Sequence, residues 1–372
     1  MFPGGLLGGA TAAMSNPDTP TKASADYEVR LGQADTTVAQ FDLDDKTAVA
    51  IARGFLRDNP TLIPALVLII SVLAFGVVAQ NFMKASTLSL VLQQVTVTGF
   101  VALAQTVVIL TAGIDLSVGE MLLFSSLVMG NLAVNNGLPT GIAIAVGIAV
   151  GTLMGALNGV LVAKMKLPPF IVTLGTLSIY RALKLAYSHS ESIRNVDIEA
   201  KAPSLLFFGN NFKVFGATVT FGMIMLLIAA GIMWYLLNRT AWGRHVHAMG
   251  DDPDAAMLSG IAVDRTLISV YTVAGLICGF SAWVAIGRVK SISPIGFETI
   301  NLDSITAVVI GGTSLFGGRG SIVGSVLGAI IVGVFITGLS LARVDSYWQT
   351  FATGCLVIIA VALDQYLRRA SK

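Results

Sequence analysis

The 372-residue sequence is 55% hydrophobic and only 12% charged, and its mean hydropathy is +0.80. Soluble domains carry about 25% charged residues, so this composition excludes an ordinary soluble protein and predicts an all-α protein that crosses a membrane many times. The net charge of +2 is too small to indicate a nucleic-acid partner.

Residues 1–59 are polar, acidic and rich in Ala, Thr and Asp, with few large apolar side chains. Segments of this composition do not bury enough apolar surface to fold. We therefore predict a mostly disordered cytoplasmic tail with an interfacial helix at 48–59. The tail lacks the basic region and apolar run of a secretory signal peptide. The membrane domain is expected to cover residues 60–372.

Apolar stretches long enough to be membrane spans follow from residue 61 onward. A spanning helix needs about 20 mainly apolar residues. Glycines interrupt several of these stretches, and two of the stretches are short. We predict ten spans, at residues 61–80, 88–110, 118–134, 140–163, 169–186, 214–237, 265–287, 302–315, 320–341 and 347–366.

The charges between the spans predict their orientation. Cytoplasmic connectors are enriched in Lys and Arg, whereas the connectors at 135–140 and 188–213 are neutral or mixed and are expected outside. An even number of spans agrees with both termini lying in the cytoplasm. The basic residues that support this orientation are Arg53, Arg57, Lys164, Lys166, Arg239, Arg244, Arg265, Arg368, Arg369 and Lys372.

Asp115 is one of only three ionisable residues between positions 61 and 163, with Lys84 and Glu120. The surrounding segment TAGIDLSVGE interrupts the helical apolar pattern, which is tolerated at membrane depth only inside protein or beside a polar cavity. Asp115 could relay protons, contact a solute or cap the next helix. We favour a cap or hinge in which its carboxylate accepts the amide of Ser117 or Val118.

Glycines recur at four-residue spacing in two predicted spans, where they allow close approach of helix backbones. We expect most of these pairs to pack within one copy of the chain rather than between two copies. A weak echo also relates residues 107–119 to 308–320, a pattern that in transporters points to a central path. The glycine pairs are Gly147/Gly151, Gly151/Gly155, Gly155/Gly159, Gly320/Gly324 and Gly324/Gly328.

The loop at 238–264 is the most polar internal segment assigned to the cytoplasm. Asp252 is a good N-cap, Pro253 suits the first helical position and Gly260 suits the position after the last turn. These residues predict a two-turn helix at 253–259, which needs to dock because two turns are unstable alone in water. It either lies against the membrane or its own helices, or docks on a soluble partner. Its apolar face carries Met257, Leu258 and Ile261.

The sequence predicts no catalytic, cofactor or metal site. The Walker A pattern of ATP-binding loops is absent, and the glycine-rich segment 311–321 has no Lys. His245 and His247 have no third ligand nearby. Cys278 and Cys355 lie in apolar spans, where we interpret them as packing residues.

These features together resemble the membrane permease subunits of bacterial ABC importers for monosaccharides of the ribose, xylose, arabinose and fructose type. The resemblance covers about residues 60–367. It rests on four motifs in the expected order, which are TAGIDLSVG at 111–119, ALNGVLVAKMKLPPFIVTLGT at 156–176, TAWGRHVHAMGDDPDAAMLSGI at 240–261 and DSITAVVIGGTSLFGGRGSIVGSVLGA at 303–329.

The resemblance implies a ten-helix permease of the kind found in larger ABC importers, placed in the bacterial inner membrane as a homodimer. A cytoplasmic ATPase subunit would bind the ATP and Mg, and a periplasmic sugar-binding protein would deliver the sugar. The permease itself would hold no cofactor. The two-turn helix would couple to the ATPase through Asp252, Pro253, Ala256, Met257, Leu258, Gly260 and Ile261.

A sugar pathway needs polar groups that hold the cargo weakly at several places. The alternative for each such residue is an interhelical hydrogen bond, worth about 0.6 kcal/mol on average. The candidates for the pathway or its gate are Gln93, Gln94, Gln105, Asp115, Ser117, Asn158, Asn301, Asp303 and Ser304.

Three other functions stay open at this point. An ABC permease for branched-chain amino acids or nucleosides would share the architecture. An ion-coupled secondary carrier would use Asp115 as its coupling carboxylate, but would leave the loop at 238–264 without a role. A membrane scaffold or sensor would leave the intramembrane polar segments without a role.

Overall fold

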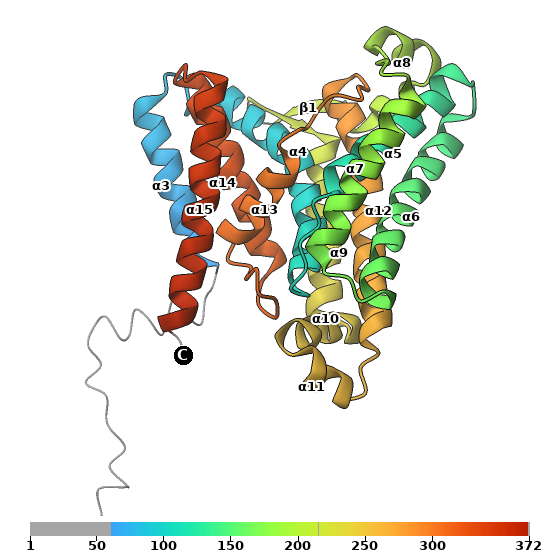
Figure 1. Cartoon of the computed structure of the whole chain (residues 1–372). Coiled ribbons are helices and arrows are strands. Elements are labelled where there is room, and N and C mark those ends of the chain that lie inside the picture. The colour runs from blue at the N-terminus through green and yellow to red at the C-terminus, as the bar shows by residue number, and fades with distance from the viewer. Residues whose placement is uncertain (1–60, 215, 371–372) are drawn as a thin grey trace, which may run out of the picture. The chain divides into compact units, whose positions relative to one another are not determined.

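The computed structural model describes residues 61–214 and 216–370, which form a helical bundle with a short β-hairpin (Figure 1). The predicted tail at 1–59 and its interfacial helix lie outside the described residues. One end of the bundle carries α10 (Ala241–Asp251) and α11 (Pro253–Leu258), and we call it the α10 end. The opposite end carries α8 (Asn195–Lys201) and the hairpin, and we call it the hairpin end.

Every segment predicted to span the membrane contains a helix. By length and composition, six helical segments of the described chain could cross a membrane, and α3 and α13 are shorter apolar helices. The protein is therefore a polytopic helical membrane protein. The helices that lie within the ten predicted spans are α3 (Leu62–Val78), α4 (Ala85–Ile109), α5 (Val118–Gly130), α6 (Thr140–Lys164), α7 (Pro169–Ser188), α9 (Phe221–Arg239), α12 (Val263–Val289), α13 (Ile300–Ile310), α14 (Ile322–Leu341) and α15 (Ser346–Ala370).

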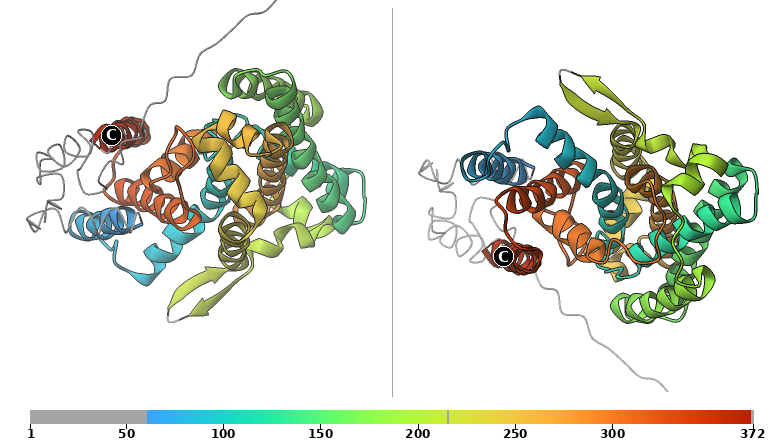
Figure 2. Two further views of the ribbon diagram at one scale, coloured as in Figure 1. Left: turned by 90° about the horizontal axis from the view of Figure 1, so that it is seen from below. Right: turned by 90° about the horizontal axis from the view of Figure 1, so that it is seen from above.

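The outer helices turn apolar side chains outward, as a surface in lipid requires. Figure 2 shows α3 and α15 at one edge of the bundle and α6 and α7 toward the other, with α4 and α12 between them. The central helix α4 is buried without interruption from Val95 to Val97 and again from Gly99 to Ile109. Exposed apolar side chains on the outer helices include Leu66, Ile69, Leu73, Leu153, Ile171, Ile179, Phe351 and Ile358.

The prediction of an all-α protein is wrong at one place. Strands β1 (Asn211–Val214) and β2 (Ala217–Thr220) form an antiparallel hairpin, and Gly216 adopts a positive φ of 83° that favours glycine at this turn. The predicted span at 214–237 therefore begins late, at Phe221, where the Thr220 side chain accepts the Met223 amide and caps α9.

Three further elements are absent from the sequence-based prediction. They are α8, the 3-10 helix η3 (Pro203–Gly209) and α10, all in connections that were expected to be loops. The predicted span at 302–315 also ends early, at Ile310. Gly312, Gly317 and Gly318 have positive φ angles in the segment that follows, so the helix cannot continue there. The π-helix η2 (Asn131–Asn135) extends α5.

Two short helices begin inside the bundle. A long helix, an irregular connection and a short helix follow one another twice, as α4, 110–117, α5 and as α12, 290–299, α13. Figure 1 shows that α5 runs toward the hairpin end and α13 toward the α10 end. The Gly119 amide, at the start of α5, donates to Asn301 Oδ1, at the start of α13, over 2.8 Å. We call α5 and α13 the half-helices, and two half-helices with neighbouring N-termini are typical of transporters.

The sequence similarity between 107–119 and 308–320 does not reflect a structural repeat. The first segment connects α4 to α5, and the structural counterparts of α4 and α5 are α12 and α13, which are connected by 290–299 instead. The two segments nevertheless touch, since the Gly318 amide donates to the Leu110 carbonyl oxygen over 3.0 Å. That contact lies at the α10 end, because Gly250 of α10 packs against both residues.

Helices α6 and α12 pack closely against each other because glycines line their contact. A Cβ atom at Gly151 would lie 2.8 Å from the Gly279 Cα, and one at Gly155 would collide with the Tyr271 carbonyl oxygen. Gly324 and Gly328 pack in the same way on the end of α13. The prediction that these glycine pairs pack within one copy of the chain is confirmed.

Replacing Gly155 tests this interface. The methyl group of Gly155→Ala has no room beside Tyr271, so we expect the free energy of unfolding of the purified protein to fall by about 1–3 kcal/mol. The control is Gly175→Ala on α7, where no atom lies within 4 Å of the new Cβ. It should leave stability unchanged or raise it by up to about 1 kcal/mol. Equal effects of the two changes would contradict the close packing of α6 on α12.

Candidate functional site

Asp115 shapes the turn that leads into α5. Its side chain is fully buried, and Oδ1 accepts the Ser117 amide at 2.8 Å and the Ser117 hydroxyl at 2.7 Å. The predicted hydrogen bond to Ser117 is confirmed. The helix itself begins at Val118, so Asp115 forms the turn before the N-cap rather than the N-cap itself.

Four of the predicted pathway residues form one buried network around this turn. Asn158 Nδ2, on α6, donates to Ser117 Oγ at 2.8 Å and to Asp115 Oδ2 at 3.5 Å. Gln105 Nε2, on α4, donates to the Asp115 carbonyl oxygen at 2.8 Å. All four side chains are fully buried. The geometry therefore favours interhelical hydrogen bonding over solute contact for Gln105, Asp115, Ser117 and Asn158.

The other predicted pathway residues lie apart from this network. Gln94 accepts from Arg288 Nη2 at 3.3 Å, and Asp303 accepts the Thr299 hydroxyl at 2.9 Å. The Ser304 hydroxyl donates to the carbonyl oxygen of Asn301 at 2.9 Å. Asn301 is the member of this group that also lines a cavity.

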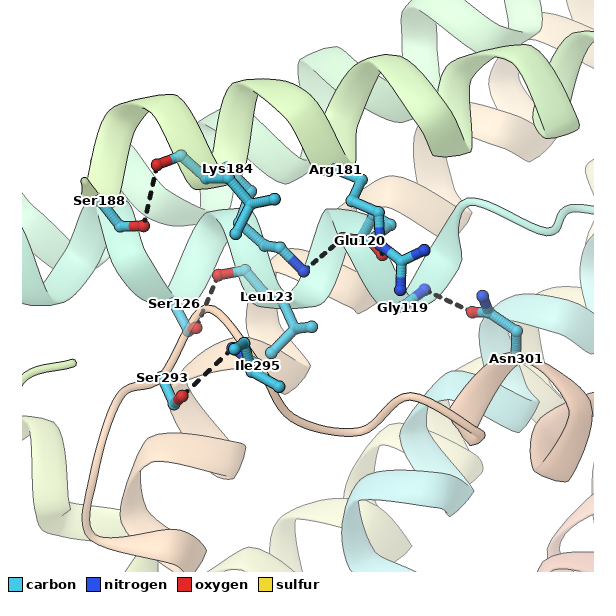
Figure 3. Close-up of polar contacts among 11 residues, drawn as sticks. Gly119, Glu120, Leu123, Ser126, Arg181, Lys184, Ser188, Ser293, Ile295 and Asn301 are labelled. Carbon is cyan, nitrogen blue, oxygen red and sulfur yellow. Dashed lines mark hydrogen bonds and ion pairs between the residues drawn. The ribbon is translucent and has the colours of Figure 1, made fainter. Parts of the chain in front are cut away.

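The cavity has a volume of about 190 Å³ and lies between α5, α7 and the connection at 290–299 (Figure 3). It begins where the two half-helices meet, because Gly119 and Asn301 both line it. Its floor and walls also include apolar groups such as Leu123, Leu185 and Ile295. Its charged lining consists of Glu120, Arg181, Lys184 and Glu298.

Glu120 is held by two cations from α7. Its Oε2 lies 2.7 Å from Lys184 Nζ, and its Oε1 lies 3.5 Å from Arg181 Nε (Figure 3). The side chains of Glu120 and Lys184 are 9% and 4% exposed, whereas that of Arg181 is 56% exposed. The pair is thus buried and the guanidinium stands at the mouth of the cavity.

Sequence reasoning missed this cluster. Glu120 is one of only three ionisable residues between positions 61 and 163, and its partners Arg181 and Lys184 lie on a later helix. A signal was present, since two basic residues three positions apart inside the predicted span at 169–186 lie on one face of a helix.

The two-turn helix at the α10 end is capped at both termini, as predicted. Asp252 Oδ1 accepts the amides of Asp254 and Ala255, each at 3.0 Å. Gly260 has a φ of 84°, and the amides of Gly260 and Ile261 donate back into the last turn, which is the Schellman arrangement. The helix ends at Leu258, one residue before the predicted end.

The two largest apolar side chains of α11 point away from the bundle. Met257 is 60% exposed and Leu258 is 86% exposed. Ala256 is buried, so its assignment to a contact with another protein is corrected: it packs against this chain's own helices. Figure 1 shows α11 projecting from the α10 end.

The neighbouring helix α10 links α11 to both irregular segments of the bundle. A Cβ atom at Gly250 would collide with the Leu110 carbonyl oxygen and would lie 2.7 Å from the Gly318 amide nitrogen. His247 Nδ1 lies 3.1 Å from the carbonyl oxygen of Gly318, a distance suited to a hydrogen bond. No cluster of three metal-ligating side chains occurs in the described residues.

The sequence as a whole matches known permeases. A family model described as the permease component of the branched-chain amino acid transport system matches residues 87–361. The chain belongs to this permease family. The fructose import permease protein of Rhizobium meliloti is 49% identical over 359 residues, which cover 96% of this chain and 100% of that protein.

Two more distant relatives carry related names. The ribose import permease protein of Bacillus subtilis is 38% identical, over 81% of this chain and 92% of its own. The D-allose transport system permease protein of Escherichia coli K12 is 34% identical, over 82% of this chain and 91% of its own. No solved structure matches the chain.

Substitutions at Asp115 separate a structural turn from a proton relay. Asp115→Ala leaves the buried Ser117 amide without its acceptor, so the free energy of unfolding should fall by about 1–3 kcal/mol. Asp115→Asn keeps an acceptor oxygen and should retain most of both stability and transport. Loss of transport in a stably folded Asp115→Asn protein would instead support proton transfer at this residue.

Proposed function

We propose that this chain is the membrane permease of an ATP-driven ABC importer that carries a monosaccharide across the bacterial inner membrane into the cytoplasm. The observation that carries the proposal is the doubly capped helix α11, which presents Met257 and Leu258 at one end of a membrane bundle. Such an apolar pair suits the groove of a soluble partner. The ATPase subunit would bind ATP and Mg, and this chain would bind no cofactor.

The names of the relatives favour a sugar as the cargo. They are named for the import of fructose, ribose, allose and galactose. The second candidate is a branched-chain amino acid or a nucleoside, and the description of the family model supports the former. Identity of 49% across the whole length of a fructose permease outweighs the family description. An ion-coupled carrier is disfavoured because the Asp115 carboxylate is enclosed by hydrogen bonds.

We infer ten membrane crossings with both termini in the cytoplasm. Each predicted span contains a helix, and the first residues of α3 and the last residues of α15 lie at the α10 end (Figure 1). The basic connectors of the sequence are expected in the cytoplasm, so the α10 end is the cytoplasmic end. A periplasmic sugar-binding protein would then meet the hairpin end.

We propose that two copies of the chain form one pathway, and that α10 transmits the motion of the ATPase. When ATP binding closes the ATPase pair, α11 moves with the groove that holds it. Because α10 contacts both Leu110 and Gly318, a shift of α10 displaces the irregular segments next to α5 and α13. The permease thereby alternates between outward- and inward-facing states.

Met257→Asp and Leu258→Asp test the docking of α11. Each places a charge in the apolar contact, and we expect a loss of about 2 kcal/mol or more in the free energy of binding to the ATPase. The measurement is co-purification from membranes. The matched control is Met165→Asp, which changes a methionine with the same 60% exposure. Met165 directly follows α6, whose last residues lie at the α10 end (Figure 1). An intact complex in both α11 variants would refute the coupling role.

Gly250→Ala tests transmission through α10. The added methyl group overlaps the Leu110 carbonyl oxygen, so α10 must move away from both irregular segments. We expect fewer sugar molecules transported per ATP hydrolysed by the reconstituted complex. The control is Gly231→Ala in α9, where the new Cβ has no neighbour within 4 Å. An unchanged ratio in Gly250→Ala would contradict transmission through this contact.

A further inference from the structure

We propose that the cavity lined by Glu120, Arg181, Lys184 and Asn301 is where this chain contacts the hydroxyl groups of the sugar during its passage. The assignment rests on the proposed function and names the contact site within it. The cavity is the place where the two half-helices meet and where buried charges line an opening (Figure 3).

The exposure of Arg181 indicates that the cavity opens to water and not to lipid. Arg181 lies near the middle of the 20-residue helix α7, and its side chain is 56% exposed. A guanidinium at that depth is strongly unfavourable in contact with lipid and normally faces a water-filled cavity. Ile179, two residues earlier, is 55% exposed and apolar, and this spacing places it on a different face of α7. The Arg181 face therefore borders an aqueous path, and the Ile179 face borders lipid.

The charges of the cavity favour a ligand without net charge. Two acidic residues, Glu120 and Glu298, and two basic residues, Arg181 and Lys184, line it. The positive end of α5 is already occupied, because Glu120 lies in its first turn and Asn301 accepts the Gly119 amide. An anionic solute would compete with Glu120 for both cations.

Sugar hydroxyls match this lining because each can donate to a carboxylate and accept from a guanidinium, an ammonium or an amide. The volume of about 190 Å³ lies below the roughly 300 Å³ at which pockets for larger ligands begin, so only a small solute fits. Lys184 and Glu120 already bind each other at 2.7 Å, so the sugar gains only part of their bonding capacity. A weak contact of this kind lets the cargo leave.

Uptake measurements test the contact. The complex of permease, ATPase and binding protein is reconstituted in liposomes, and ATP-dependent uptake of labelled fructose and ribose is measured. Arg181→Ala should lower uptake about tenfold, the loss of one hydrogen bond to a charged group. Glu120→Gln should do the same. The control Lys164→Ala removes an exposed charge from a different ion pair, with Asp264, and should transport normally.

Thiol labelling tests the aqueous path without relying on transport, in a protein whose Cys278 and Cys355 are replaced by Ala. We expect a membrane-impermeant maleimide to modify Arg181→Cys and to leave Ile179→Cys unmodified. Absence of labelling at Arg181→Cys, or equal labelling of both, overturns the proposal.

The uptake results distinguish a wrong contact site from a wrong function. If the wild-type complex shows no ATP-dependent sugar uptake, the proposed function is wrong. If the wild type transports sugar and Arg181→Ala and Glu120→Gln transport equally well, only the contact site is wrong. If the wild-type complex instead takes up labelled leucine, and neither fructose nor ribose competes with that uptake, the cavity serves an amino acid.

Discussion

The whole arrangement depends on satisfying backbone polar groups at membrane depth, where water cannot do so. The connection at 110–117 is irregular yet lies within the bundle, so side chains must complete its hydrogen bonds. Gln105 donates to the carbonyl oxygen of Asp115, Thr173 donates to that of Ile114, and the Asp115 carboxylate accepts the Ser117 amide. These bonds allow α5 to begin in the interior instead of at the membrane surface.

The start of α5 in the interior brings its N-terminus next to that of α13. Because α13 also begins inside, its Asn301 can accept the Gly119 amide, and a cavity remains beside this junction. Breaking a buried ion pair by removing one partner costs about 3–5 kcal/mol, so Glu120 and Lys184 hold α5 and α7 together while lining that cavity. Glu120 and Lys184 thus stabilise the fold and also line the proposed sugar contact site.

A glycine also determines the packing at the α10 end of the bundle. At Gly250 the backbone of α10 lies directly against the backbones of Leu110 and Gly318. Any side chain at this position would push α10 away from them. The contact joins the segments that precede α5 and follow α13 to the helix that carries α11. In the proposed mechanism, a displacement of α11 would reach both half-helices through these backbone contacts, which deform less than long side chains do.

The sequence by itself determined the apolar segments that become the long helices, the caps of α11 and the hydrogen bond between Asp115 and Ser117, because each depends on residues within a few positions of one another. Four sequence motifs also carried the resemblance to the permease family. Only the tertiary structure decided that Asn158 and Gln105 close a network around Asp115, that Ala256 is buried, and that Lys184 and Arg181 hold Glu120 beside a cavity. Those contacts join residues on different helices, and close packing of the helices, not local sequence, brings them together.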